Sequence, residues 1–138
     1  MAKKDRNFIP KAQIDSQKKL VFSFEYYDTC SDKYCLSKFN SSDISTVTKR
    51  LQQLNSKTLR EIFSQGKVLH FHEVDWNKTI KKNGFPNSMA NRMSPFQFSL
   101  NGINNQKARV YGAYGSEVFY IVWFDLNHEI WPSFKKNT

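Results

Sequence analysis

The sequence predicts an α+β domain in which an antiparallel sheet carries a helix pair packed on one face. Three observations predict it: a helical repeat of apolar residues in the middle of the chain, a strand-like segment before it, and three strand-like segments after it. The chain has 138 residues, of which 15% are aromatic, so it can bury one bulky core. We therefore expect a single domain over residues 20–138, preceded by a basic arm over residues 1–19.

The first strand-like segment lies at the start of the expected domain. Residues 20–27 alternate in character, and Phe22, Phe24 and Tyr26 share one face. Residues 28–33 have the composition of a turn, and residues 34–39 again resemble a strand. This pattern predicts a hairpin over residues 20–39.

Two helices are predicted next. Ser41 or Ser42 can cap the first helix, whose apolar residues recur at helical spacing and share one face: Ile44, Val47, Leu51 and Leu54. Thr58 and Glu61 have the spacing of a capping box, which predicts a second helix over residues 57–65.

The second half of the chain predicts most of the sheet. Residues 68–76 fit either a strand or an ordered loop, and residues 77–94 have the Gly, Pro and Asn content of an exposed excursion. Three strands follow, over residues 96–100, 109–113 and 118–124. Because the last of these is apolar or aromatic at every position, we expect it to be covered on both faces.

The charge of the chain indicates an anionic partner. The formal net charge is +9, and Lys and Arg crowd the first nineteen residues. Such a field attracts polyanions, among which nucleic acid is the leading class, although a basic protein can also be merely soluble. The chain shows no signal peptide and no apolar run of membrane-spanning length, so we expect no membrane partner and a cytoplasmic location. Cys30 and Cys35 are expected to be free thiols, and no metal-ligand or cofactor motif occurs.

Candidate catalytic residues lie on and after the last two strands. Arg109 and Tyr111 leave the same face of one strand, where a guanidinium beside a phenol can hold a phosphodiester, with Lys107 in support. His128 follows the last strand and can donate or accept a proton. The alternatives are that Tyr111 belongs to the core and that the segment around His128 is an ordinary turn.

A candidate nucleic-acid-binding segment lies in the excursion. Lys81, Lys82 and Arg92 are interspersed with aromatic residues, a mixture that suits single-stranded nucleic acid. The alternative is an exposed loop that its aromatic residues anchor. We interpret His70 and His72 as packing or surface residues.

The C-terminal segment also carries a family resemblance. The runs RVYGA at residues 109–113 and VFYIVWFDLNH at residues 118–128 resemble the closing hairpin of small, mostly uncharacterised proteins of bacteria and their mobile elements. A helix pair followed by antiparallel strands resembles the RelE/ParE-like toxin superfamily. The resemblance implies cleavage of messenger RNA on the ribosome, an antitoxin partner, and catalytic roles for Arg109, Tyr111 and His128.

Two functions follow as the main hypotheses. The first is an RNA-directed toxin that acts as a metal-independent endoribonuclease, without a cofactor. The second is a non-catalytic basic module of a mobile element or a phage-defence or counter-defence system, which binds nucleic acid or an acidic protein partner. A third hypothesis is an interaction domain whose aromatic residues form an oligomer interface.

Overall fold

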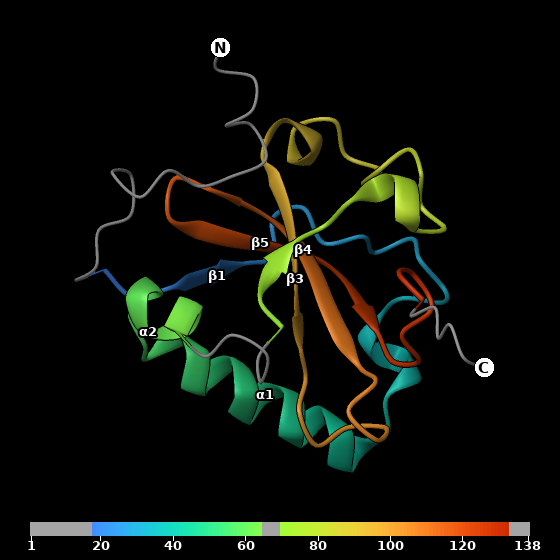
Figure 1. Cartoon of the computed structure of the whole chain (residues 1–138). Coiled ribbons are helices and arrows are strands. Elements are labelled where there is room, and N and C mark those ends of the chain that lie inside the picture. Colours follow the sequence, from blue (N-terminus) through green and yellow to red (C-terminus); the bar gives the residue numbers. More distant parts are fainter. Residues whose placement is uncertain (1–17, 65–69, 133–138) are drawn as a thin grey trace, which may run out of the picture.

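The fold is built on a five-stranded sheet. The computed structural model describes residues 18–64 and 70–132, and in this part the strand order is β1-β5-β4-β3-β2 (Figure 1). Neighbouring strands are antiparallel except β1 and β5, which are parallel. The strands are β1 Val21–Ser23, β2 His72–Glu73, β3 Ser94–Ser99, β4 Arg109–Gly115 and β5 Val118–Asp125. Together with two α-helices, this sheet confirms the predicted α+β class.

The helix pair is present, and the Thr58/Glu61 capping box is confirmed, but the predicted cap of the first helix, Ser41 or Ser42, is wrong because both residues lie inside that helix. Helix α1 spans Ser41–Asn55, and its cap is Asn40, whose side chain accepts a hydrogen bond from the Asp43 amide at 2.8 Å. Helix α2 spans Leu59–Ser64. Its capping box is reciprocal, because the Thr58 amide donates to Glu61 Oε1 at 2.9 Å and the Glu61 amide donates to Thr58 Oγ1 at 3.2 Å.

Both helices cover the same face of the sheet (Figure 1). Their buried residues contact apolar residues of the strands in one core cluster, and Ile44 and Leu51 of the predicted apolar stripe pack against its margin. Members of this cluster include Val47, Leu54, Leu59, Ile62, Phe98, Phe119 and Phe124. The helical periodicity therefore predicted the correct buried face.

The opposite face of the sheet is covered by irregular segments. Three short 3₁₀ helices lie in the coil that packs around the sheet: η3 Leu36–Lys38, η4 Trp76–Lys78 and η5 Ala90–Arg92. A second core cluster forms there and includes Tyr34, Phe85, Ala90, Tyr111, Trp123 and Ile130. The burial of strand 118–124 on both faces is thus confirmed. The excursion after β2 is only partly exposed, because Thr79, Phe85 and Ala90 are buried.

The predicted hairpin over residues 20–39 is wrong. β1 pairs in parallel with the start of β5, and residues 34–39 hold a 3₁₀ helix instead of a strand. After β1 the chain follows the edge of β5: the Asp28 amide donates to Val122 O at 3.1 Å, and Trp123 Nε1 donates to Asp28 Oδ2 at 2.8 Å. The aromatic alternation of residues 20–27 therefore matches a strand distant in sequence, rather than the next segment.

The β4–β5 hairpin fixes the middle of the sheet. Its turn consists of Ser116 and Glu117, both with positive φ (53° and 68°), as a two-residue type I′ turn requires. A register shift at Tyr111/Gly112 lets β5 turn two successive side chains, Val122 and Trp123, into the second core. A Cβ on Gly112 would overlap the Phe119 ring, so only glycine fits beside this bulge.

Two further predictions concern the ends of the chain and membranes. The predicted basic arm lies almost wholly outside the described residues, which begin at Lys18; Lys19 forms an isolated bridge with Thr58. Within residues 18–64 and 70–132, no helix has the length and apolar character needed to cross a membrane.

Candidate functional site

Arg109 lies at one end of the sheet, in a row of polar residues. It begins β4 and is paired across the sheet with Ser99 of β3 on one side and Asp125 of β5 on the other. All three residues are buried, and Arg109 is only 8% exposed. A buried charge at a sheet end needs local partners, and its surroundings show how this one is held.

The Arg109 guanidinium is fixed by its own turn. Nη1 donates to the backbone carbonyls of Gln106 at 2.6 Å and Ala108 at 3.2 Å, and lies 3.5 Å from Ser99 Oγ. Nε is buried and has no hydrogen-bond partner in the described part of the chain. Burial lowers the pKa of Arg109, while the negative charge of Asp125 acts in the opposite direction. Arg109 therefore supplies a fixed positive charge.

Two of the three histidines, His70 and His128, lie within electrostatic reach of this charge, and His72 lies beside His70. The His70 and His72 rings lie 6.5 Å apart, centroid to centroid. Burial lowers the pKa of His70, and Arg109, His72 and His128 are close enough to lower it further. Burial also lowers the pKa of His128, again with Arg109 as the next cause. Both imidazoles are thereby favoured in the neutral, proton-accepting form near pH 7.

His72 is the most exposed of the three histidines and is held by Gln97. Its Nε2 lies 3.2 Å from Gln97 Nε2, while its Nδ1 lies 3.4 Å from the Glu73 carbonyl and its ring packs edge-on against Trp131 at 5.4 Å. Gln97 is buried, and its Oε1 has no partner among the described residues. A half-turn of the Gln97 amide exchanges its donor for its acceptor, so the same contact can hold His72 neutral or protonated.

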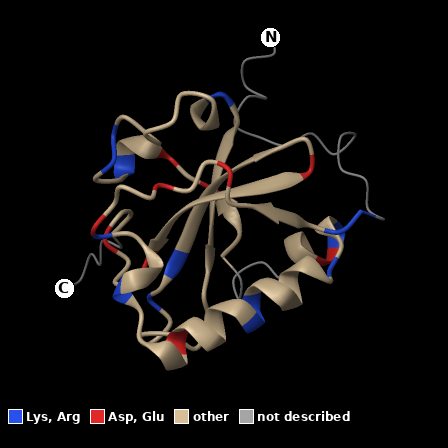
Figure 2. Cartoon of the chain, turned by 180° about the vertical axis from the view of Figure 1, so that it is seen from behind, with Lys and Arg blue, Asp and Glu red and all other residues tan. Residues whose placement is uncertain are grey.

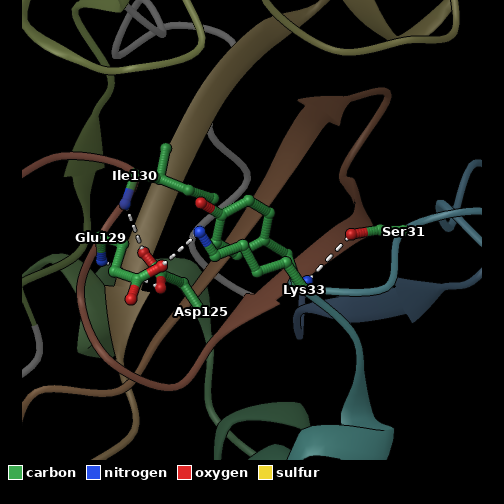
Figure 3. A network of polar contacts seen from close by, with 6 residues as sticks. Ser31, Lys33, Asp125, Glu129 and Ile130 are labelled. Atoms are coloured by element: carbon green, nitrogen blue, oxygen red, sulfur yellow. Dashed lines mark hydrogen bonds and ion pairs between the residues drawn. The ribbon is translucent and has the colours of Figure 1, made fainter.

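His128 is positioned by a turn that Asp125 organises (Figure 3). The buried Asp125 carboxylate accepts hydrogen bonds from the Glu129 amide at 3.0 Å and the Ile130 amide at 2.8 Å. His128 itself has a left-handed backbone, with φ 59°. Glu129 also pairs with Lys33 at 3.5 Å, which ties the turn to the segment after β1. Asp125 thus fixes the backbone on both sides of a strained histidine.

Of the predicted catalytic residues, Arg109 and His128 lie in this cluster. Tyr111 lies on the same sheet face as Arg109, as strand parity predicts, but it is fully buried in the second core. Burial raises the pKa of its hydroxyl well above the ordinary value. We therefore assign Tyr111 to packing and give it no contact with a substrate. Lys107 is exposed in the turn before β4, and its charge contributes to lowering the pKa of His128.

The predicted binding residues Lys81, Lys82 and Arg92 all lie in the excursion after β2. Lys81 Nζ lies over two aromatic rings of the second core, 5.2 Å from the Tyr34 centroid and 5.1 Å from the Trp123 centroid. Lys82 Nζ donates to the carbonyls of Asn77 at 2.8 Å and Thr79 at 3.0 Å, and so closes η4. Arg92 is exposed. Lys81 therefore contacts aromatic residues outside the excursion, whereas Lys82 has its partners within it.

His70, His72 and Gln97 were missed as site residues. The sequence signal for the histidines is weak, since His72 lies on a two-residue strand and His70 precedes it with a left-handed backbone, φ 57°. That signal gives no indication that His128 and Arg109, far along the chain, lie beside them. In the described segments, no three residues of the His, Cys, Asp and Glu types are arranged to hold a metal ion.

Comparison of the chain with protein-family models, curated proteins and solved structures gives no match. The chemistry of the cluster is therefore argued from its own geometry. It combines a fixed cation, two imidazoles favoured in the neutral form and one exposed imidazole whose contact with Gln97 accommodates either protonation state.

Proposed function

We propose that the protein is a metal-independent endoribonuclease of toxin type, with its active site in the cluster of His70, His72, Arg109 and His128. The single observation that supports this most strongly is that His70 and His128 both lie within electrostatic reach of one buried arginine, with the His72 ring beside that of His70. When the 2′-hydroxyl of the RNA attacks the adjacent phosphate, the reaction needs a base, an acid and a cation for the phosphate. These four residues include every one of those groups.

The proposed reaction is an internal transesterification. His128, favoured in the neutral form, accepts the proton of the 2′-hydroxyl, and the 2′-oxygen attacks the adjacent phosphorus. The bond from phosphorus to the 5′-oxygen breaks, and His72 donates a proton to that oxygen as it leaves. The products are a 2′,3′-cyclic phosphate and a 5′-hydroxyl. Arg109 provides a fixed positive potential for the extra negative charge of the transition state.

Charge and topology support an RNA substrate. The net charge of +9 favours binding to a polyanion. A helix pair on one face of the sheet, with Arg109 and His128 at the sheet end, is the basis on which we propose membership of the RelE/ParE-like toxin superfamily. On this proposal the protein acts in the cytoplasm on messenger RNA, free or on the ribosome, and an acidic antitoxin is its protein partner.

The test is inducible expression in a bacterial host, with growth and total RNA integrity followed together. The wild-type chain is expected to arrest growth and to leave cut RNA. His72→Asn and His128→Asn, at equal soluble protein, are expected to do neither. Arg60→Gln, which removes an exposed charge on α2 away from the cluster, is the matched control and is expected to behave as the wild type.

Normal growth with intact RNA on wild-type expression would contradict the proposal. Salt-dependent RNA binding by the purified chain, without cleavage, would then favour the non-catalytic binding module. Growth arrest that both histidine variants retain would also contradict the proposed site.

A further inference from the structure

A second polar hollow lies beside the histidine cluster and plays no part in the reaction proposed above. It is an open cleft of about 780 Å³ between the segment that joins β2 to η4 and the segment that joins η5 to β3. Its walls include Glu73, Asp75, Trp76, Asn77, Arg92 and Tyr114. This volume is sufficient for a nucleotide-sized ligand.

Glu73 gives the cleft an unsatisfied acceptor. Its Oε2 is buried and has no hydrogen-bond partner, and it is the only carboxylate oxygen among the described residues in that state. A buried carboxylate without donors is costly, so the site favours a ligand that supplies N–H groups. Glu73 Oε1 and Oε2 can together accept two parallel hydrogen bonds from adjacent donors.

The other walls suit a nucleotide. Trp76 is half-buried, and Phe85 and Trp123 meet it edge-on, with interplanar angles of 86° and 87°, so its ring is held in a fixed orientation. Arg92 is exposed, and its Nη1 makes one weak contact, 3.7 Å from Met89 Sδ. An aromatic ring and an exposed cation are what a base and its phosphate need.

We propose that this cleft is a guanine subsite, in which Glu73 accepts the N1–H and N2–H donors of the base, Trp76 contacts its ring and Arg92 faces a flanking phosphate. Guanine is favoured because its Watson–Crick edge presents two adjacent donors. Adenine and cytosine place an acceptor beside their amino group, and uracil offers one donor between two carbonyls. The proposal rests on the proposed function and adds to it a preference for guanine beside the cut.

The position of the cleft relative to the histidines supports a flanking nucleotide. Glu73 follows His72 directly in β2, and Val74, which also lines the cleft, lies two residues beyond His72. Two residues along a strand span roughly 6.6 Å, which is comparable to the spacing of successive nucleotides in an extended strand. The cleft and His72 therefore share the short strand β2, which places a bound nucleotide next to the strand that carries the proposed acid.

Binding should depend on pH through the same carboxylate. Burial is the main cause that raises the pKa of Glu73 to about 7, and the negative charge of Asp75 is the second cause. The ionised form accepts from guanine, so guanosine binding is expected to strengthen as the pH rises from about 6 to about 8. The other charged and titratable groups that line the cleft are Asp75, Arg92 and Tyr114. Burial raises the pKa of Tyr114 to about 12, which keeps it neutral over this range.

The experiment is a titration of the full chain with each of the four ribonucleoside 3′-monophosphates at pH 8. Binding is measured by calorimetry and by tryptophan fluorescence. Guanosine 3′-monophosphate is expected to bind about 10-fold more tightly than the other three. Glu73→Gln is expected to remove this preference, while Glu25→Gln, an exposed carboxylate elsewhere, retains it. Trp76→Phe is expected to remove most of the fluorescence change and to keep the preference.

Equal binding of all four nucleotides, no binding of any, or an unchanged preference in folded Glu73→Gln would each overturn the subsite. These outcomes are separate from the proposed function. RNA cleavage without a guanine preference would retain the nuclease and reject the subsite. Guanosine binding that depends on Glu73, in a chain that cuts no RNA, would retain the subsite and reject the nuclease.

Discussion

At the scale of single residues, the site depends on a cation that cannot move away. The Arg109 guanidinium donates to two backbone carbonyls of its own turn and is almost fully buried. A charge held in this way is already in position before a substrate binds, so it acts on its neighbours in the free protein as well. Its first measurable consequence is that it lowers the pKa values of His70 and His128.

Arg109→Gln is expected to raise the pKa of His70 and His128. The positive charge of Arg109 disfavours their charged forms, so its removal moves both values back towards the ordinary one. Histidine ring signals followed by NMR over a pH series measure this directly. Arg50→Gln, a half-buried arginine on α1, is the matched control and should leave both values unchanged. Unchanged pKa values of His70 and His128 in folded Arg109→Gln would contradict the described cluster.

His128 allows backbone and chemical effects to be separated. Its φ of 59° is strained for most residues but tolerated by Asn. His128→Asn is expected to keep wild-type stability, and His128→Ala to lose about 1 kcal/mol of unfolding free energy. Both should lose RNA cleavage. Urea denaturation and a cleavage assay on the same preparations test this, and retained cleavage in the Asn variant would count against a catalytic His128.

At the scale of elements, the β4–β5 hairpin connects the two ends of the sheet. Arg109 and Asp125 lie at its open end, and the Ser116–Glu117 turn closes the other. The turn can therefore be altered without touching the histidines. Both turn residues carry side chains at positive φ, where Asn and Gly are the favoured residues.

The double change Ser116→Asn/Glu117→Gly is expected to stabilise the fold by about 1 kcal/mol. Relief of positive φ for two residues with side chains outweighs the loss of the exposed ion pair from Lys18 to Glu117. RNA cleavage should be unchanged, because the turn lies at the far end from Arg109. A lower urea midpoint in this variant would show that the turn is not the I′ turn described.

The elements also show what could be predicted from the sequence. The helix pair, its capping box and the last three strands were predicted because their signals are local. The hairpin over residues 20–39 failed because β1 pairs with β5, and no local pattern reports a partner about a hundred residues away.

The same limit applies to the site. Parity on one strand placed Arg109 and Tyr111 on a shared face, and this was correct. The prediction could not show that coil residues cover that face and bury Tyr111. It also missed His70 and His72, because β2 has only two residues and gives almost no periodic signal.

At the scale of the whole molecule, the sheet separates two cores of different construction. Helices cover one face, whereas aromatic residues in coil cover the other. Lys and Arg of the described part are spread over helices, strands and loops (Figure 2). Glu73, His70 and His128 are partly buried ionisable groups, and their shifted pKa values make the stability of the fold depend on pH.

Folding stability is expected to depend on pH below about 7 through two opposed effects. The folded-state pKa of Glu73 is raised to about 7, so its contribution is full below its unfolded pKa and lost as the pH rises through 7. The pKa values of His70 and His128 are lowered, so their contribution is lost as the pH falls below about 6.5.

Urea denaturation between about pH 5 and pH 8 measures both effects. Relative to Glu73→Gln, the wild-type chain should lose about 1 kcal/mol as the pH rises from about 5 to about 7, a figure that allows for solvent screening of a partly exposed group. A stability difference between the two chains that is independent of pH would contradict the burial of this carboxylate.

The most direct test of the proposed nuclease is cleavage of a defined RNA by the purified chain in the presence of a chelator, with and without ribosomes. The wild type is predicted to leave 2′,3′-cyclic phosphate and 5′-hydroxyl ends, and to spare a substrate with 2′-deoxyribose at the cut. His128→Asn, equally folded, should be at least about 100-fold slower. A wild-type chain that cuts no RNA under either condition, or a His128→Asn chain that cuts at the wild-type rate, would contradict the account.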